Sequence, residues 1–420
     1  MRRVTVLLAY DLGGRIKDST EAKELLAGRF EDVGTDRMGL KPFNLSYINW
    51  HDQILRMRCP DMEMPTGHTA RRRVYVYPWL GVLHIELTVE LPEDFGPAEA
   101  LEFYESFVEW KNRDYLPYLQ ESGSMRTPLR EQAAQVPSAD QHSSFREVVQ
   151  PVRELLEEAE QLTERPQTYY FHDFRMVFET GDDGLGSPED YAGLLGLLPT
   201  DLREAGSDYP IPARTSLAGL QLYSSGWVTV IGAPEGSAHE EFRDHIQVLV
   251  RLTHVQWFIC QVWIYILGSL IASNTDADDA DTLYKLADSR RIFDTDLTEV
   301  GNTNVMLKDP YLISVAECLA GAFRVDGHRR TAEKHFESVA HAEQQRMELR
   351  RQREATTLQL LFALSAAVAV ALMIPELWGT SWTLVALTLF VGVMLLIVIG
   401  YRVRQETRRY ARRHGHHRRH

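Results

Sequence analysis

The sequence lacks the short motifs that identify several large enzyme classes. It contains no P-loop, no HExxH, no GxSxG and no GxGxxG after a predicted strand. Those patterns carry phosphate binding, zinc hydrolysis, serine catalysis and dinucleotide binding, so we expect no enzyme of these classes. We expect no N-terminal signal peptide either, because the first apolar run, Val4–Tyr10, is short and no small-residue cleavage site follows it.

Cysteine and positive charge are also scarce. The three cysteines, Cys59, Cys260 and Cys318, are odd in number and far apart in the chain. They predict no disulfide framework and indicate a reducing compartment. Lysine and arginine number 45 against 59 aspartates and glutamates, which gives a formal net charge of −14. This acidic balance argues against nucleic acid as a partner.

Charge is absent altogether from two stretches near the C-terminus. Leu358–Ile374 and Trp382–Tyr401 contain no charged residue, and only Pro375–Ser381 separates them. Roughly 17–25 apolar residues cross a bilayer as a helix, so each stretch is long enough to span it. The pattern predicts a transmembrane hairpin of two antiparallel helices, with Trp378 and Tyr401 among its interfacial aromatic residues.

Arginines precede the first uncharged stretch and follow the second. Arg350 and Arg351 lie before the first stretch, and the tail Arg402–His420 holds eight arginines and one glutamate. The connecting loop carries Glu376 and no lysine or arginine. The positive-inside rule therefore predicts a protein of the plasma (inner) membrane with two spans and both termini in the cytoplasm. The arginines expected to contact lipid headgroups are Arg402, Arg404, Arg408, Arg409, Arg412 and Arg413.

The pattern of residues 1–235 mixes strands and helices. It predicts one cytoplasmic domain of the α+β or α/β class. In Leu83–Leu91, apolar residues alternate with His84, Glu86, Thr88 and Glu90, which predicts a strand with one buried face and one face in water. Ser19 is expected to be the N-cap of a helix, and Pro97 to open another.

Residues 236–327 predict a helical cytoplasmic segment. Phe242–Ala272 is long and apolar enough to suggest a third span, but it contains Arg251, His254 and Gln261. Since ionisable groups are costly at membrane depth, a helix buried in the cytoplasmic domain or between subunits is the preferred interpretation. An acidic run holds Asp276, Asp278, Asp279 and Asp281. These carboxylates predict either a divalent-cation site or a solvated loop that caps the next helix.

Residues 328–357 predict a long charged helix, which we call the stalk helix. With the first span it reaches about 70 Å at 1.5 Å per residue, if it is unbroken from Arg329 to Ile374. Ala332, Phe336, Val339 and Ala342 form an apolar stripe at helical spacing. We expect this coiled-coil-like helix to pack against its own domain and neighbouring subunits. The hairpin at 358–401 and the basic tail at 402–420 complete the chain.

This order of elements resembles that of the CorA family of divalent-cation transporters. The clearest local similarity is Met373-Ile-Pro375-Glu376-Leu377, which resembles the Met-Pro-Glu-Leu of the family's outer loop. The resemblance implies a homo-oligomer, a pentamer in that family, whose first span lines a pore and whose cytoplasmic domain gates it. It also implies a divalent cation, Mg²⁺, as the bound or transported ion.

The family's Gly-Met-Asn signature is missing at the end of the first span, where the sequence runs Ala369-Val-Ala-Leu-Met-Ile-Pro. Hard cations need oxygen ligands. The candidate pore-lining or pore-mouth residues are therefore Thr356, Thr357, Gln359, Ser365 and Glu376. Equally, Glu376 is compatible with an ordinary loop residue and Ser365 with a helix-packing residue.

Three functions remain open at this point. The first is an oligomeric cation channel or transporter gated by its cytoplasmic domain. The second is a membrane-anchored sensor or effector that responds to a cytoplasmic ligand without Mg²⁺-selective transport. The third is a plain two-span anchor for a scaffold domain, which predicts a monomer or dimer without a pore.

Overall fold

The structure is a computed structural model of the whole chain. It describes residues 2–17, 19–32, 55–64, 66–78, 80–92, 94–121, 148, 155, 162–163, 174–180, 185, 187–196, 213–217, 220–232, 237–272, 290, 293, 310–378 and 392. By its contacts the chain divides into two compact units, residues 1–275 with 286–339 and residues 276–285 with 340–420. The first unit contains the sheet and its covering helices.

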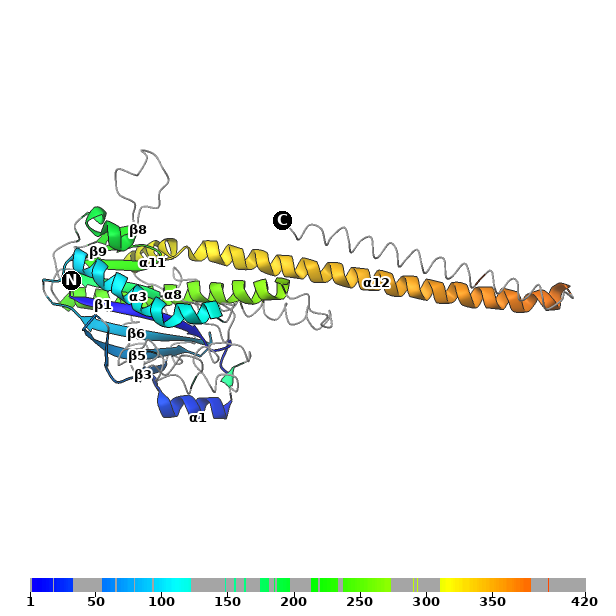
Figure 1. Cartoon of the computed structure of the whole chain (residues 1–420), viewed down its shortest axis with the longest axis horizontal. Helices are drawn as coiled ribbons and strands as arrows, with labels where there is room; N and C mark the ends of the chain where they lie inside the picture. The colour runs from blue at the N-terminus through cyan, green and yellow to red at the C-terminus, as the bar shows by residue number, and fades with distance from the viewer. Residues whose placement is uncertain are drawn as a thin grey trace, which may run out of the picture. The chain divides into compact units, whose positions relative to one another are not determined.

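Among the described residues, a mixed sheet of ten strands forms the centre of the first unit (Figure 1). Its order is β2-β3-β5-β6-β1-β7-β10-β9-β8, and β4 pairs with β5 outside this path. β7 and β10 pair in parallel, whereas the other described pairs are antiparallel. The strands are β1 (Arg3–Asp11), β2 (Glu31–Asp32), β3 (Leu55–Arg58), β4 (Met62–Glu63), β5 (Thr69–Tyr77), β6 (Val82–Glu90), β7 (Phe174–Thr180), β8 (Ala213–Leu217), β9 (Leu220–Ser224) and β10 (Val228–Gly232).

The sheet and its helices confirm the α+β class rather than the α/β alternative. Besides the helices that cover the sheet, the described helical turns near it include η4 (Pro188–Tyr191) and α7 (Ala192–Leu195). As the sequence predicted, Ser19 caps α1 (Thr20–Arg29), because its Oγ accepts a hydrogen bond from Ala22 N at 3.1 Å. α3 (Pro97–Glu121) also begins at the expected proline.

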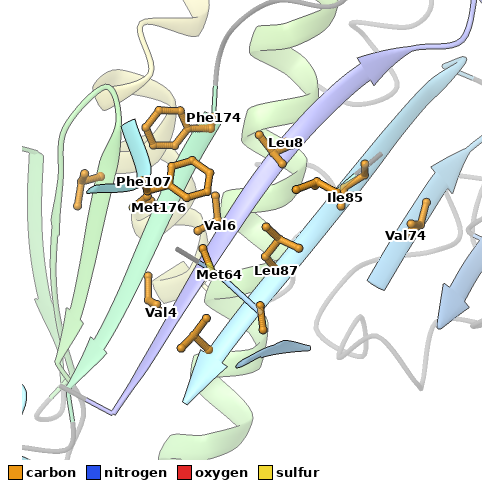
Figure 2. Packing of buried hydrophobic residues seen from close by; sticks show 14 of the residues in the cluster. Val4, Val6, Leu8, Met64, Val74, Ile85, Leu87, Phe107, Phe174 and Met176 are labelled. Carbon is orange, nitrogen blue, oxygen red and sulfur yellow. The ribbon is translucent and has the colours of Figure 1, made fainter. Parts of the chain in front are cut away.

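One face of the sheet carries the main hydrophobic core. Val4, Val6 and Leu8 of β1 alternate toward this face, beside Ile85 and Leu87 of β6 (Figure 2). The core is closed by aromatic and aliphatic residues from α3 and α1, which include Phe103, Phe107, Trp110, Ala22 and Leu26. This face holds the sheet together by apolar burial.

The opposite face of the sheet is polar, and it corrects one sequence prediction. His84, Glu86 and Thr88 of β6 were expected in water, but every residue of this strand except Glu90 is buried. The covering element is α8 (Ser237–Ala272), which packs along β1. Ile246, Leu249 and other α8 residues are buried, so the structure agrees with the buried-helix interpretation of 242–272.

The β5–β6 hairpin turns at a position that only glycine can occupy. Gly81 has a φ of +63°, in the left-handed region that residues with a side chain disfavour. A Cβ at Gly81 would lie 1.7 Å from the carbonyl oxygen of Gly14. The backbone of this turn also accepts a hydrogen bond, from Leu12 N to Gly81 O at 2.7 Å. The turn therefore fixes β6 against the end of β1.

Two further helices follow α8 along the described chain. α11 (Pro310–Ala322) contacts α8 and β8, and α12 (Val325–Trp378) is one continuous helix of 54 residues. In α12, Ala332, Phe336 and Val339 are buried as predicted, whereas Ala342 is exposed. The boundary between the two units falls inside α12, between Val339 and Ala340. The stalk helix and the residues of the first predicted span thus belong to a single helix.

Within the described residues, no helix has both the length and the mean hydropathy of a membrane span. The side chains of α12 are described as far as Ala367, except those of Glu343 and Arg346, and again at Ala369 and Val370. The second predicted span, 382–401, lies outside the described residues except for Gly392. The two-span hairpin therefore stays a prediction.

Candidate functional site

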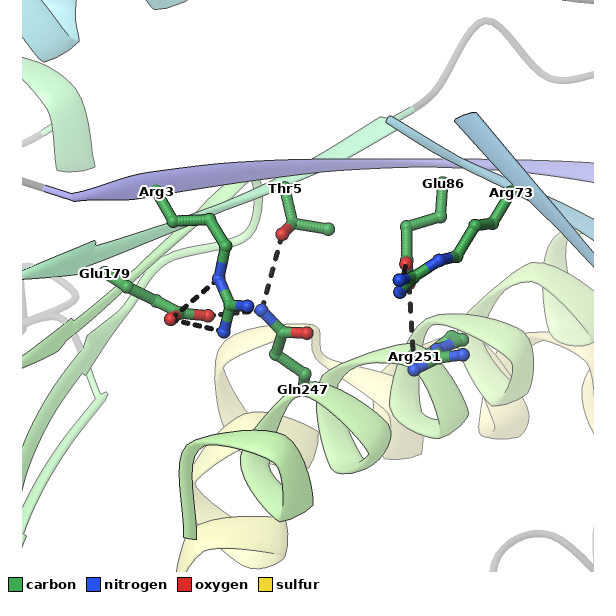
Figure 3. A network of polar contacts seen from close by, with 7 residues as sticks. All are labelled: Arg3, Thr5, Arg73, Glu86, Glu179, Gln247 and Arg251. Carbon is green, nitrogen blue, oxygen red and sulfur yellow. Dashed lines mark hydrogen bonds and ion pairs between the residues drawn. The ribbon is translucent and has the colours of Figure 1, made fainter. Parts of the chain in front are cut away.

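The most unusual feature of the first unit is a layer of polar side chains buried between the sheet and α8. We call it the polar layer. It draws residues from β1, β5, β6 and β7 and from one face of α8, and two charged clusters lie within it (Figure 3). Most protein interiors avoid charged groups unless they are paired. Such a layer therefore either stabilises the fold or forms part of a functional site.

The first cluster joins β1 and β7 to α8. Arg3 donates from Nε and Nη2 to Glu179 Oε2, at 3.0 and 2.7 Å. Gln247 of α8 donates to the other Glu179 oxygen and lies 3.4 Å from Thr5 Oγ1 (Figure 3). Burial raises the pKa of the Glu179 carboxyl, and the ion pair with Arg3 opposes this shift. Two strands and one helix therefore meet at one carboxylate.

The second cluster joins β5 and β6 to α8 around Glu86. Arg73 lies 3.5 Å from Glu86 Oε1, and Arg251 lies 3.7 Å from Glu86 Oε2. The Arg251 guanidinium also lies 4.1 Å from the centre of the Tyr75 ring, a cation–π distance. Arg251 and Glu86 are only 5% and 3% exposed. One buried carboxylate therefore faces two guanidinium groups at long ion-pair distances.

A pair of histidine rings lies beside this cluster. His84 of β6 and His254 of α8 are both fully buried, with ring centroids 5.0 Å apart. Within the described part of the chain, none of their four ring nitrogens has a hydrogen-bond partner. Burial, and then the nearby Arg251, lower the pKa of His84 to about 3. Burial, followed by His84 and Arg175, lowers the pKa of His254 well below its usual value. Both rings are therefore neutral near pH 7.

A series of ring contacts connects these histidines to the base of α12. Tyr77 of β5 meets His84 at 5.7 Å between centroids, and His254 stacks on Trp257 at 5.9 Å. Trp257 in turn meets His328 of α12 edge-on at 5.7 Å. Gln261 of α8 hydrogen bonds to His328 Nδ1 at 2.8 Å. Because the energy of an aromatic contact depends on the orientation of the rings, a shift of α8 on the sheet would change the contact between Trp257 and His328.

Arg175 of β7 reinforces the same junction. Its guanidinium lies over the rings of Trp227, Trp257 and Phe323 at 5.0, 4.6 and 4.8 Å. Phe323 directly follows α11, and Arg324 then turns the chain into α12 with a φ of 52°. One arginine of the sheet therefore contacts α8 and the residue that follows α11, two residues before α12 begins.

Burial also acts on the cysteines of α8 and α11. Burial raises the pKa of the Cys260 thiol to about 12 and that of Cys318 to about 11, so neither is a thiolate near pH 7. No group of three or more His, Cys, Asp or Glu residues that could hold a metal ion occurs among the described residues. The ring contacts of Trp257 with His254 and His328 connect this layer to α12.

The residues singled out from the sequence lie elsewhere. Thr356 and Thr357 are on α12 and donate their hydroxyl hydrogens to Gln352 O and Arg353 O, at 2.7 and 2.9 Å. Ser365 does the same to Phe362 O at 2.9 Å. These bonds leave the hydroxyl oxygens with lone pairs for other partners.

The other predicted site residues are less fully described. Gln359 is exposed on α12, and Glu376 lies within α12, but its side chain is outside the described ones. The acidic set Asp276, Asp278, Asp279 and Asp281 and the arginines of the tail also lie outside the described residues. Their predicted roles remain predictions.

The sequence contained signals for the polar layer that were interpreted differently. Alternation predicts His84 and Glu86 on a solvated strand face, and Arg251 and His254 are ionisable groups that disfavour a membrane span. The two sets meet because α8 lies on that strand face, which local patterns do not reveal. Arg3, Arg175, Glu179 and His328 had no distinguishing pattern around them.

Comparison with protein-family models, with curated proteins and with solved structures finds no match to this chain. The resemblance to the CorA family therefore rests on the order of the segments and the residues of the predicted outer loop.

Proposed function

We propose that this chain is an integral membrane protein whose α+β domain controls a C-terminal two-span hairpin through α12. The observation that carries the proposal is the exposure of apolar residues on one uncharged part of that helix. Leu358, Leu361, Phe362 and Val370 are 55%, 57%, 73% and 57% exposed. Contiguous exposed apolar surface of this kind marks a membrane or protein contact.

A close approach within the second unit supports the hairpin itself. A Cβ placed on Gly392, in the second predicted span, would lie 3.7 Å from Ala367 Cβ in the first. Small residues at such crossings let the backbones of membrane helices pack closely. The proposed hairpin brings these two residues together in an antiparallel arrangement.

The proposed control runs from the sheet to the hairpin along a continuous helix. The base of α12 is packed by Ala332, Phe336 and Val339, and His328 receives the ring contacts from α8. The same helix continues to Trp378 without a break. A change in the polar layer that rotates or shifts α12 would therefore act directly on the membrane segment.

Cation conduction is the output that the CorA resemblance suggests. In that proposal a homo-oligomer lines its pore with α12, and the oxygens of Thr356, Thr357 and Ser365, with Glu376 at the outer mouth, face hydrated cations such as Mg²⁺. Both termini lie in the cytoplasm at the plasma (inner) membrane. The second candidate is a ligand-responsive membrane effector without Mg²⁺-selective transport, which the missing Gly-Met-Asn favours.

Membrane insertion is tested by alkaline carbonate extraction of membranes that contain the full-length chain. The wild type and Leu349→Arg, at an exposed α12 residue before the predicted span, should remain in the pellet. Leu361→Arg, inside the span, should shift a substantial fraction into the supernatant, since arginine disfavours insertion by about 2.5–3.5 kcal/mol. Release of the wild type by carbonate would refute the proposal.

The output is tested separately in proteoliposomes. Flux of Mg²⁺, Co²⁺, Ni²⁺ or a monovalent cation that falls on Glu376→Gln would support conduction. Absence of all four fluxes from protein that carbonate does not extract would leave the effector as the supported candidate.

A further inference from the structure

Three side chains of the polar layer carry buried nitrogen atoms without hydrogen-bond partners. They are His84 of β6 and Arg251 and His254 of α8, which we call the histidine–arginine cluster. Within the described part of the chain, both nitrogens of each ring and Nε and Nη1 of Arg251 have no partner. The two histidines are 0% exposed and Arg251 is 5% exposed. The solvent around the protein therefore does not reach these nitrogens.

The three side chains lie together at the interface between β6 and α8. Arg251 and His254 are three residues apart on α8 and therefore lie on the same face of the helix. The rings of His84 and His254 have centroids 5.0 Å apart. After burial, the charge of Arg251 is the second cause that lowers the pKa of His84, so the guanidinium lies near this ring. The unpartnered nitrogens are thus concentrated at one place.

Such a concentration is unfavourable unless a bound molecule completes the hydrogen bonds. A buried polar group without a partner has lost its hydrogen bonds to water and has gained none in return. Folded proteins contain few such groups, and those that occur are commonly satisfied by an internal water molecule or an ion. The histidine–arginine cluster combines several of them on two packed elements. We therefore expect a small molecule or ion to be bound there.

The chemistry of the cluster favours an anion as this ligand. The nitrogens of arginine only donate hydrogen bonds, and a neutral imidazole has one donor and one acceptor, so donors predominate. Glu86 Oε2 lies 3.7 Å from Arg251 Nη2, and the same carboxylate also lies 3.5 Å from Arg73 (Figure 3). An anion would supply both acceptor capacity and the negative charge that a shared, distant carboxylate supplies only in part. A metal cation would be repelled by Arg251.

We propose that His84, Arg251 and His254 bind one small monovalent inorganic anion of the halide class, such as chloride. The ligand has to be small, because the three side chains that would hold it are almost completely buried. A guanidinium is weakly hydrated and suits a buried ion pair. The anion contacts β6 through His84 and α8 through the other two side chains. Its binding therefore stabilises the packing of α8 on the sheet.

Thermal melting of the purified full-length chain at pH 7 in neutral detergent tests the binding. Sodium chloride replaces sodium gluconate stepwise at constant ionic strength, since gluconate is too large for a closed site. The wild-type midpoint should rise with chloride and with bromide, because a ligand bound only by the folded state raises stability. His84→Phe/His254→Phe keeps two rings without their nitrogens. It should weaken chloride binding, obtained from the midpoints, at least about tenfold for each ring.

His341→Phe, at an exposed histidine of α12, is the matched control and should respond to chloride as the wild type does. The general effect of exchanging one salt for another acts on the whole surface, so it is the same in all three proteins. An equal chloride response in the wild type and in a cooperatively melting double variant would overturn the proposed site. A wild-type midpoint that is the same in chloride and in gluconate would overturn the anion in favour of ordered water.

Crystals of the wild type grown in sodium bromide give a readout that needs no variant. Bromide is a halide with a strong anomalous signal, so we expect an anomalous peak within hydrogen-bond reach of Arg251 and at least one of the two rings. An anomalous map without this peak would overturn the proposal, also in the case that the double variant does not fold. Neither readout depends on carbonate extraction, so failure here is distinct from failure of the proposed membrane function.

Discussion

Acid should destabilise this protein through His84 and His254. Both rings are fully buried in the polar layer, and burial together with Arg251 lowers the pKa of His84 to about 3. The pKa of His254 is likewise lowered by burial, His84 and Arg175. Tyr77 faces His84 from β5. In the unfolded chain a histidine has a pKa of about 6.5, so unfolding allows both rings to take up protons.

The direction and size of the effect follow from this difference. Below pH 6.5 the unfolded state binds more protons than the folded state, so the contribution of the neutral rings is complete above pH 6.5. It is lost as the pH falls from 6.5 toward 3. One pKa unit corresponds to 1.36 kcal/mol, so between pH 7 and pH 5 each histidine lowers the free energy of unfolding by roughly 2 kcal/mol. For the pair the loss is roughly 4 kcal/mol, a large share of a typical stability of about 5–15 kcal/mol.

Urea unfolding of the full-length chain in neutral detergent, followed by tryptophan fluorescence at pH 7, 6 and 5, measures this loss. His84→Phe/His254→Phe keeps two packed rings and removes both titrating groups. Its loss between pH 7 and 5 should be smaller than that of the wild type by roughly 4 kcal/mol. His341→Gln, at an exposed histidine, should follow the wild type.

An equally steep decline in the double variant would refute the argument, because the protons would then bind elsewhere. The raised pKa of Glu179 acts in the opposite direction, since its protonation on acidification favours the folded state. Glu179 is present in the wild type and in the double variant, so its effect cancels when the two pH-dependent losses are subtracted.

Three substitutions test other parts of the first unit by the same urea titration at pH 7. Glu86→Gln should lower the free energy of unfolding by about 3–5 kcal/mol, because it leaves the buried Arg251 without its carboxylate; a loss under 1 kcal/mol would contradict the role of this ion pair. Phe336→Ala should lose about 3–5 kcal/mol, since the ring is 1% exposed at the base of α12, and unchanged stability would mean that α12 is not anchored there. Gly81→Ala should abolish cooperative unfolding or lower the midpoint sharply, because its Cβ would overlap the Gly14 carbonyl; a normal midpoint would show that the turn relaxes easily.

Local patterns in the sequence determined several elements of the fold. The alternation in 83–91 identified β6, Ser19 and Pro97 marked where α1 and α3 begin, and the stripe at 332, 336 and 339 marked the buried face of α12. These signals are local, because a cap, a proline or a periodic stripe acts through residues a few positions away. The uncharged segments at 358–374 and 382–401 likewise predict the hairpin from hydropathy alone.

The tertiary structure alone decided which faces are buried and which charges meet. Alternation shows that β6 has a polar face, but whether that face meets water depends on α8, more than 140 residues later in the chain. For the same reason the pairing of Glu86 with Arg251, the histidine pair and the path to His328 were not predictable. Long-range pairing also set the strand order, and it placed Arg58 opposite Arg73. Contacts between distant segments depend on the packing of the whole domain, so no short window of sequence contains them.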